Sequence, residues 1–260
     1  MARLVIVHGY GEHSGRYREF MAWLAARGVA SFSFDFRGHG RSPGRRGYVR
    51  RWAEYVDDLR TFLAQPRLRP DEGPPLFVLG HSHGGLVVLA AAIDKAVDLG
   101  GVAGVALSSP YLRNAIVVPM HRLIVARIIN PLVPWARFRS GVRPEWLSSD
   151  PRMQLETIED VLCHRSATPR WFLSMRREQA RVMGRAHEFR HPMLMLIGSR
   201  DPVADPAACH AFYERAGSTD KSLKVYPDMV HELLREPERH RVFEDIFRWI
   251  TRPIPPSRRA

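Results

Sequence analysis

The segment Gly80–Gly84, which reads GHSHG and is followed by Gly85, is the strongest indication of chemistry in the sequence. It separates the apolar run Leu76–Leu79 from a helical run that begins at Leu86. A serine at a sharp strand-to-helix turn projects its hydroxyl over the edge of a sheet, and flanking glycines remove side chains that would collide there. The pattern predicts Ser82 as a nucleophile. The alternative is a glycine-rich helix start that Ser82 merely caps.

A serine attacks a carbonyl only when a base accepts its proton and an acid orients that base. Two later turns supply these residue types: Asp201 follows the apolar run Met193–Ile197, and His231 follows Leu223–Tyr226. Both turns fall at the edge of a sheet where the strands end, so we predict Asp201 as the acid and His231 as the base. The alternative for His231 is a turn histidine with a structural hydrogen bond.

Two other aspartates lie near these turns. Asp205 directly precedes Pro206 at an expected helix start, where an aspartate is more often a cap. Asp228 is three residues from His231 and is expected to shape that turn. We therefore prefer Asp201 to both.

Acyl transfer also needs two backbone donors for the oxyanion that develops on the substrate. One should follow the nucleophile and the other should lie in a loop after an early strand. The sequence offers His83 for the first and Tyr10, after the run Leu4–Val7, for the second. We predict that their amides form the hole, which leaves both side chains free to shape the pocket.

These residues need a scaffold of strands that end at one edge, and the apolar periodicity predicts one. Short apolar runs alternate with longer amphipathic runs, which is typical of a mostly parallel, doubly wound α/β sheet. The predicted strands are 4–7, 30–34, 76–79, 102–107, 193–197 and 223–226, and the predicted helices are 17–27, 50–64, 84–97, 206–216 and 238–251.

Residues 111–188 break this rhythm, because they carry no strand pattern and are divided by six prolines. We predict a helical cap there, inserted into a core made of residues 1–110 and 189–252. Residues 253–260 are rich in proline and arginine and are expected to be a flexible tail.

The start of the predicted cap, Ala115–Trp135, combines many apolar residues with Arg122 and Arg127, and Arg137 follows it, as in an amphipathic helix pair with basic flanks. Two compatible interpretations stay open. Its apolar face packs on the core, or it lines an acyl-chain tunnel and makes a peripheral contact with anionic membrane.

Composition limits the remaining possibilities. The chain has 260 residues and a formal charge of +12, and lysine occurs only at three positions, so its basic surface consists of arginine. These arginines are scattered along the chain with no run of five or six, which disfavours nucleic acid as a partner. Two cysteines and no secretory signal indicate a cytoplasmic protein. No ligand spacing for a metal, P-loop or dinucleotide fingerprint is present, so we expect neither metal nor cofactor.

Several segments, taken in order along the chain, resemble the monoacylglycerol lipase and lysophospholipase family of α/β-hydrolases. They are His8–Tyr17 (HGYGEHSGRY), Asp35–Ser42 (DFRGHGRS), the GHSHG segment and Val230–Leu234 (VHELL). The resemblance implies Ser82, Asp201 and His231 as the triad and Tyr10 and His83 as the oxyanion donors. It also assigns Asp35, Arg37 and His39 to a structural role beneath the site.

Two features depart from that family. His83 stands where relatives usually carry methionine, and the chain begins at the strand that is normally third, without the antiparallel edge pair. Either the start is set late, or the fold tolerates a shorter sheet whose new edge could pair with another chain.

The combined pattern predicts a serine carboxylic ester hydrolase that cleaves monoacylglycerol or lysophospholipid through an acyl-enzyme on Ser82. The alternatives within this fold are a short-chain carboxylesterase, an aminopeptidase-like enzyme and a carbon-carbon hydrolase. A further alternative is a non-catalytic module of this fold that binds membrane or nucleic acid. The sequence does not predict the oligomeric state.

Overall fold

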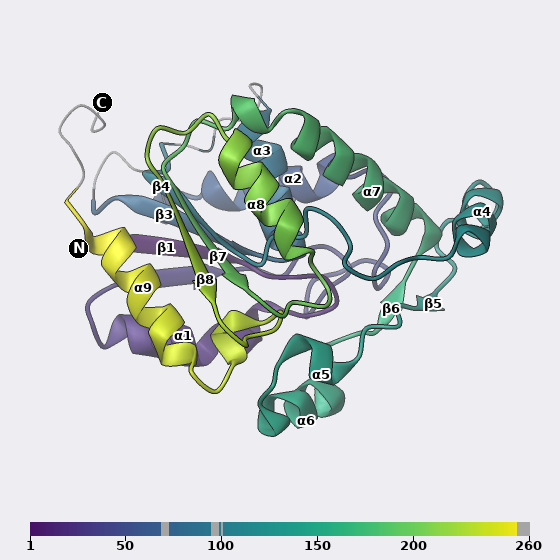
Figure 1. Cartoon of the computed structure of the whole chain (residues 1–260), viewed down its shortest axis with the longest axis horizontal. Coiled ribbons are helices and arrows are strands. Elements are labelled where there is room, and N and C mark those ends of the chain that lie inside the picture. The colour runs from purple at the N-terminus through teal and green to yellow at the C-terminus, as the bar shows by residue number, and fades with distance from the viewer. Residues whose placement is uncertain (69–72, 95–98, 100, 254–260) are drawn as a thin grey trace.

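The computed structural model describes residues 1–68, 73–94, 99 and 101–253, and its centre is a parallel sheet (Figure 1). Within these residues the sheet has six strands in the order β2-β1-β3-β4-β7-β8. The four inner strands are buried throughout, as apolar parallel strands covered on both faces must be. The strands are β1 (Arg3–Val7), β2 (Ala30–Ser33), β3 (Leu76–His81), β4 (Gly104–Ser108), β7 (Met193–Gly198) and β8 (Lys221–Tyr226).

Helices cover both faces of this sheet (Figure 1). Alternate residues of β1 belong to two different cores, with Val5 and Val7 on one face and Leu4 and Ile6 on the other. The first face packs against α2 (Ala53–Leu63), α3 (His83–Ile93) and α8 (Pro206–Arg215). The second face packs against α1 (Arg18–Ala25) and α9 (Arg239–Thr251). Short 3-10 turns occur at Ser14–Tyr17, Pro66–Leu68, Ala186–Glu188 and Leu233–Arg235.

The predicted doubly wound sheet is confirmed, and its strands lie where the apolar runs placed them. Helix α3 ends at Ile93, earlier than expected, and residues 95–97 of the predicted helix lie outside the described part of the chain. The predicted flexible tail also lies outside it, apart from Pro253.

The segment 111–188, called the insert below, leaves the sheet after β4 and returns before β7, and these two strands are neighbours. It contains α4 (Met120–Ile129), α5 (Pro144–Leu147), α6 (Pro151–Glu159) and α7 (Pro169–Gly184). Proline begins α5, α6 and α7, where its missing N–H costs nothing. The sequence showed no strand pattern here, but β5 (Phe138–Arg139) and β6 (Ser166–Ala167) form a two-residue antiparallel pair, too short to give a periodic signal.

The prediction of a helix pair over Ala115–Trp135 is wrong, because this segment contains the single helix α4. Pro119 precedes the helix, and Pro131 and Pro134 prevent a second one. Most apolar side chains of the segment do not pack on the core. Those that are exposed are Val117, Met120, Ile124, Val125, Ile128, Leu132, Val133 and Trp135.

Strand β2 is one edge of the described sheet, and each of its residues is partly or fully exposed. The described helices include none that is both long and apolar enough to cross a membrane.

Candidate active site

Ser82 lies at the turn between β3 and α3 in a strained backbone conformation, with φ +50° and ψ −115°. Residues with a side chain rarely adopt this combination of φ and ψ. Backbone strain of this kind concentrates at functional sites. The turn is tight because a β-carbon on Gly84 would lie 2.2 Å from the carbonyl oxygen of Val7. Similarly, one on Gly80 would lie 2.7 Å from the Cα atom of Gly85. The glycines therefore let α3 start directly against β1 and leave Ser82 at the sheet edge.

The structure brings together the three residues that the sequence singled out. The Ser82 Oγ atom lies 2.9 Å from Nε2 of His231, and Nδ1 of His231 lies 2.8 Å from Oδ2 of Asp201. All three residues are buried. Nδ1 donates to the carboxylate, so Nε2 is the nitrogen that can accept the serine proton.

Asp201 is fixed by its own turn. Its Oδ1 atom accepts the amides of Val203 and Ala204 at 2.8 and 2.9 Å, which leaves Oδ2 for His231. Burial opposes a charge on the His231 ring, but the Asp201 carboxylate outweighs it, and the pKa of His231 is raised above its ordinary value. This pair can hold the positive charge that a base acquires during catalysis.

The two rival aspartates have other partners. Asp205 is the N-cap of α8, and its Oδ1 atom accepts the amide of Ala207 at 2.9 Å. Asp228 has an exposed side chain at φ +63°, 3.6 Å from Arg200. Neither is hydrogen-bonded to His231 in the described residues.

The loop after β1 approaches the nucleophile closely. A β-carbon on Gly9 would be in van der Waals contact with Cβ of Ser82, at 3.4 Å, and would lie only 2.8 Å from the Glu12 carboxylate, which glycine avoids. The amide of Gly9 donates to Glu12, and the next amide along the loop is that of Tyr10. The amide of His83 belongs to the first turn of α3, where N–H groups lack partners within the helix. The two predicted oxyanion donors thus lie on segments that flank Ser82.

A cavity of about 160 Å³ opens beside Ser82 and His231. One part of its wall is apolar and comes largely from the insert. The other part is polar and comes from the loop after β1, from Glu232 beside His231, and from α6 and the residues that follow it in the insert. The apolar wall includes Ile116, Val118, Val142, Leu147, Trp171 and Phe172, and the polar wall includes Glu12, Arg16, Thr157, Cys163 and Glu232.

Sequence reasoning missed the buried ion-pair network in this polar wall. Arg16 lies 2.6 Å from Glu232 and 3.0 Å from Glu12, and Tyr17 donates to Glu12 at 2.7 Å. Burial would raise the pKa of Glu12, but nearby His81 and Arg16 outweigh it and lower that pKa to about 2. Arg235 lies 3.5 Å from Glu232, so the two carboxylates face two guanidinium groups and the buried network balances its own charge. The sequence did hold one signal for this network, because Glu12 and Glu232 lie in the segments His8–Tyr17 and Val230–Leu234 that carry the family resemblance.

Asp35, Arg37 and His39 lie away from the cavity and brace loops, as the resemblance implies. Asp35 accepts the amides of Ser14 and Arg41. Arg37 forms a forked pair with Asp58, and His39 bonds the Arg37 carbonyl.

The described residues contain one group with the side chains of a metal site: His13, Asp160 and Cys163, whose ligand atoms lie within 4.8 Å of one another. In His13, Nδ1 accepts the amide of Gly15, so Nε2 carries the proton that bonds Asp160. Arg16 also lies 3.6 Å from the Cys163 sulfur. A neutral ring with no free lone pair beside a guanidinium does not suit a cation.

Comparison with known proteins gives consistent results. The profile of the Hydrolase_4 family, described as serine aminopeptidase, S33, matches residues 1–238. The monoacylglycerol lipase of Mycolicibacterium smegmatis is 31% identical over 253 residues, covering 95% of this chain and 87% of that protein. The monoglyceride lipase of Homo sapiens is 28% identical, and the match covers 96% of this chain and 82% of the human protein. Phospholipase YtpA of Bacillus subtilis is 26% identical, and the match covers 94% of this chain and 93% of that protein.

Solved structures show the same similarity. The monoacylglycerol lipase of Paleococcus ferrophilus superposes with a TM-score of 0.83 at 28% identity, covering 95% of this chain and 93% of that one. A soluble variant of monoglyceride lipase from Saccharomyces cerevisiae, in complex with a substrate analogue, superposes with a TM-score of 0.84 at 26% identity. That match covers 96% of this chain and 86% of the yeast chain.

Proposed function

The chain belongs to the Hydrolase_4 family and has the α/β-hydrolase fold, and on that premise we propose that it hydrolyses monoacylglycerol through an acyl-enzyme on Ser82. It is a serine carboxylic ester hydrolase of lipid esters. The observation that carries the residue assignment is the continuous hydrogen-bonded chain from Ser82 through His231 to Asp201, which ends beside a largely apolar cavity.

The reaction follows from this geometry. Ser82 attacks the ester carbonyl carbon while its proton passes to Nε2 of His231, and Asp201 stabilises the imidazolium. The amides of Tyr10 and His83 bind the oxyanion, a contribution of about 3 to 4 kcal/mol for a donor of this kind. His231 then protonates the leaving glycerol oxygen as the ester bond breaks. Water then attacks the acyl carbon as His231 accepts its proton. The bond to Ser82 Oγ breaks, His231 returns the proton to that oxygen, and the fatty acid leaves.

The polar wall of the cavity favours a neutral headgroup. The Glu12–Arg16–Glu232 network, together with Arg235, is buried and balances its own charge, so it offers a phosphodiester no unpaired cation. Glycerol hydroxyls can instead donate to its carboxylate oxygens. Lysophospholipid is the second candidate, because exposed Arg165 at the cavity could pair with a phosphate and because one relative is named a phospholipase.

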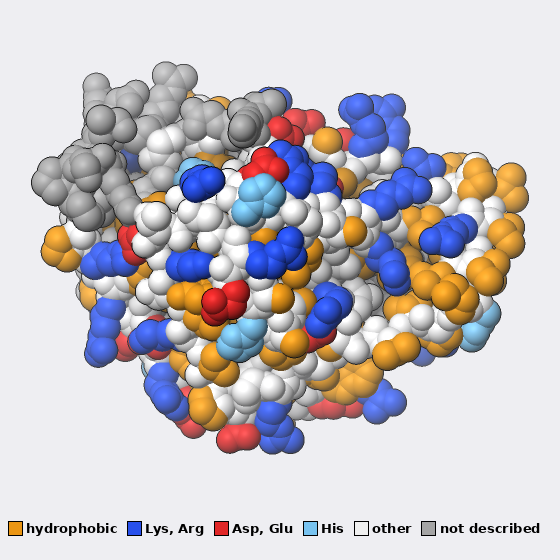
Figure 2. Space-filling view, turned by 45° about the horizontal axis from the view of Figure 1, so that its top comes forward, with side chains coloured by type: hydrophobic (Ala, Val, Ile, Leu, Met, Phe, Trp, Pro, Cys, Tyr) orange, Lys and Arg blue, Asp and Glu red, His pale blue; other side chains and the backbone are white. Residues whose placement is uncertain are grey.

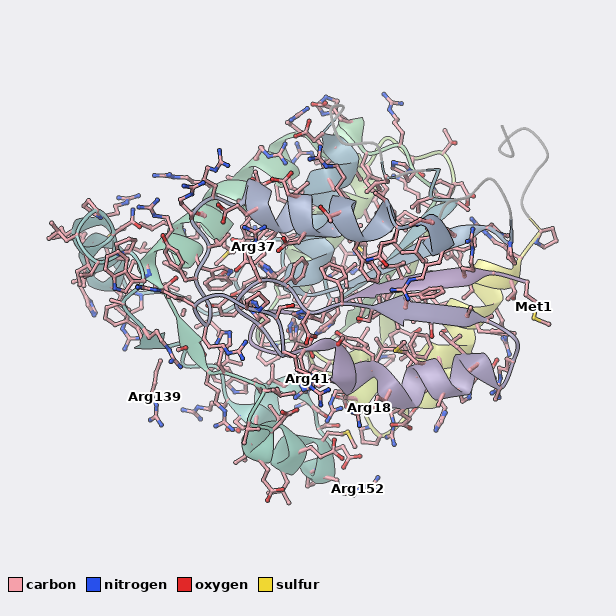
Figure 3. The ribbon with its side chains drawn as sticks, turned by 180° about the vertical axis from the view of Figure 1, so that it is seen from behind. Met1, Arg18, Arg37, Arg41, Arg139 and Arg152 are labelled. Atoms are coloured by element: carbon pink, nitrogen blue, oxygen red, sulfur yellow. The ribbon has the colours of Figure 1, made fainter. Side chains whose placement is uncertain are left out.

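We assign the insert as a cap over a core of residues 1–110 and 189–252, and propose that it rests on anionic membrane. Figure 2 shows apolar side chains gathered at the end of the molecule where α4 lies, with arginine or lysine beside them. The exposed fractions of Val117, Leu132 and Ile128 are 89%, 73% and 61%. Arg139, on β5, extends outward from the insert (Figure 3). An apolar patch with a basic border suits a surface of anionic lipid.

The membrane contact can be tested by cosedimentation with vesicles. Wild type should bind vesicles of phosphatidylglycerol better than vesicles of phosphatidylcholine, and added salt should weaken the difference. The double variant Ile128→Ser, Leu132→Ser should bind neither. Binding that salt leaves unchanged, or that the double variant retains, would contradict the proposed surface.

The enzymatic proposal is tested by labelling and by a substrate panel. A fluorophosphonate probe should label wild type and should not label Ser82→Ala. Hydrolysis of monoacylglycerol should exceed that of lysophosphatidylcholine and of short p-nitrophenyl esters. Faster cleavage of the short esters or of an aminoacyl amide would indicate another substrate class, and a lack of labelling would indicate a binding module.

A further inference from the structure

The loop that carries one predicted oxyanion donor is held by the insert at three points. The amide of His164 donates to the carbonyl oxygen of Gly11 at 2.8 Å. The Tyr10 hydroxyl lies 3.0 Å from the carbonyl oxygen of Ser166. The Tyr10 ring stacks on Trp171, with ring centroids 3.5 Å apart and planes inclined by 19°. Residues of the insert therefore contact Tyr10 at both its ring face and its hydroxyl.

The insert residues that hold Tyr10 are themselves fixed. Thr168 is the N-cap of α7, and its hydroxyl oxygen accepts the amide of Trp171 at 3.3 Å. The same hydroxyl donates to the carbonyl oxygen of Gly47 at 2.9 Å, and the Tyr10 hydroxyl lies 3.0 Å from that oxygen. Trp171 is 4% exposed. The start of α7 thus forms a rigid support behind Tyr10.

The other predicted donor, the amide of His83, is supported mainly from the core, and the His83 ring is further from Trp171 than the Tyr10 ring is, with centroids 6.1 Å apart. Its turn is fixed from the core, because the Ser82 amide donates to the Ser108 carbonyl on β4 at 2.9 Å. The Leu86 amide continues the turn by donating to the Ser82 carbonyl at 3.1 Å, and the amide of Tyr111, the first residue of the insert, donates to the same oxygen at 3.0 Å. One donor is therefore fixed mainly by the core, with one bond from the root of the insert, whereas the other is held by the body of the insert.

From this asymmetry we propose that Trp171 is a positioning residue: by stacking on Tyr10 it sets the place of the Tyr10 amide, so the oxyanion hole is complete only when the insert is seated. The inference rests on the proposed function, since it takes the Tyr10 amide as a donor. An oxyanion donor acts at 2.7 to 3.1 Å and loses effect when its support loosens. The insert then contributes to the chemical step as well as to substrate access.

Variants of the stacked pair separate this role from simple lining of the cavity. Trp171→Ala removes the support, and Trp171→Phe keeps an aromatic face in place. Tyr10→Phe keeps the stack and removes the hydroxyl. Phe172→Ala is the matched control, because Phe172 lines the same cavity from the next position of α7. Urea unfolding of each variant establishes that it is folded.

The readout compares two inhibitors in the full-length enzyme. A long-chain alkyl trifluoromethyl ketone forms a tetrahedral oxyanion with the serine, whereas a glycerol alkyl ether binds like the substrate without reacting. Trp171→Ala should lower kcat and the ketone affinity together, by about 10- to 100-fold, with a much smaller change in ether affinity. Tyr10→Phe should show the same pattern at about 3- to 10-fold, and Trp171→Phe should remain within about threefold of wild type.

The control should behave differently. Phe172→Ala should weaken the ether and the ketone equally and raise KM, because it removes contact made with both. Equal weakening of both inhibitors by Trp171→Ala, or an unchanged kcat in that variant and in Tyr10→Phe, would overturn the inference. In contrast, a wild-type enzyme that neither hydrolyses esters nor reacts with a fluorophosphonate would overturn the proposed function itself.

Discussion

Replacement of Asp201 by asparagine should disable the base by inverting its tautomer. The amides of Val203 and Ala204 both donate to Oδ1, so that position must hold an acceptor, which in the variant is the amide oxygen. The NH₂ group then takes the place of Oδ2 and faces Nδ1 of His231 at about the distance of the present 2.8 Å bond. Nδ1 must accept, Nε2 must carry the proton, and Ser82 loses its base.

The expected loss is larger than the value of one hydrogen bond. A charge-assisted bond contributes about 1.5 to 3 kcal/mol, which alone would lower kcat by about 10- to 100-fold. Inverting the tautomer should lower it by about 10⁴-fold, as in serine hydrolases of the same logic. We would measure kcat/KM on a medium-chain p-nitrophenyl ester between about pH 5 and 10. In wild type the rate should fall as pH drops through the pKa of His231, which lies above its ordinary value.

Asp205→Asn is the matched control, because Asp205 caps α8 and does not bond His231. It should change kcat by less than about threefold, since asparagine is also a good cap. If Asp201→Asn keeps more than about a tenth of the wild-type rate at neutral pH, the tautomer argument is wrong. If Asp205→Asn proves as damaging, the acid has been assigned to the wrong residue.

Three further changes test the turn and the buried network. Gly84→Ala should destabilise the fold by about 3 kcal/mol in urea unfolding, because its β-carbon would lie 2.2 Å from the Val7 carbonyl oxygen. Ser82→Gly should unfold at higher urea than Ser82→Ala, since glycine relieves the strain at φ +50°, and equal midpoints would argue against strain. The pKa of Glu12 is lowered from 4.5 to about 2, so its carboxylate stabilises the fold fully above the first value and loses this effect as pH falls through the second. Glu12→Gln should therefore show a weaker dependence of unfolding free energy on pH in that window, and an unchanged dependence would contradict the lowered pKa.

The sequence predicted the sheet and the turn at Ser82 well, because both depend on local patterns. Buried parallel strands read as short apolar runs, and a glycine-flanked serine between a strand and a helix has few alternative structures. The positions of Asp201 and His231 followed because strand ends share one edge. Their catalytic roles stay predictions until the variants are measured.

Other features depend on contacts between distant segments, which periodicity does not encode. The Arg16–Glu232 pair joins the first loop to the last turn, and each residue alone reads as an ordinary surface charge. The stack of Tyr10 on Trp171 also could not be predicted, because it depends on how the insert folds back over the first loop. In the insert, an apolar sequence over Ala115–Trp135 predicted two helices, but proline allowed one and left apolar residues facing solvent.

The insert departs from β4 and rejoins at β7, and these strands are already hydrogen-bonded neighbours. Its length and content can therefore change without disturbing the register of the sheet, which makes it a natural place for new substrate preferences to evolve. That freedom has a limit, because the stretch from His164 to Trp171 grips the first loop. A chimera with the insert of another enzyme should therefore keep residues 164–171 of this chain. Without them it would have a new substrate pocket but a lower kcat.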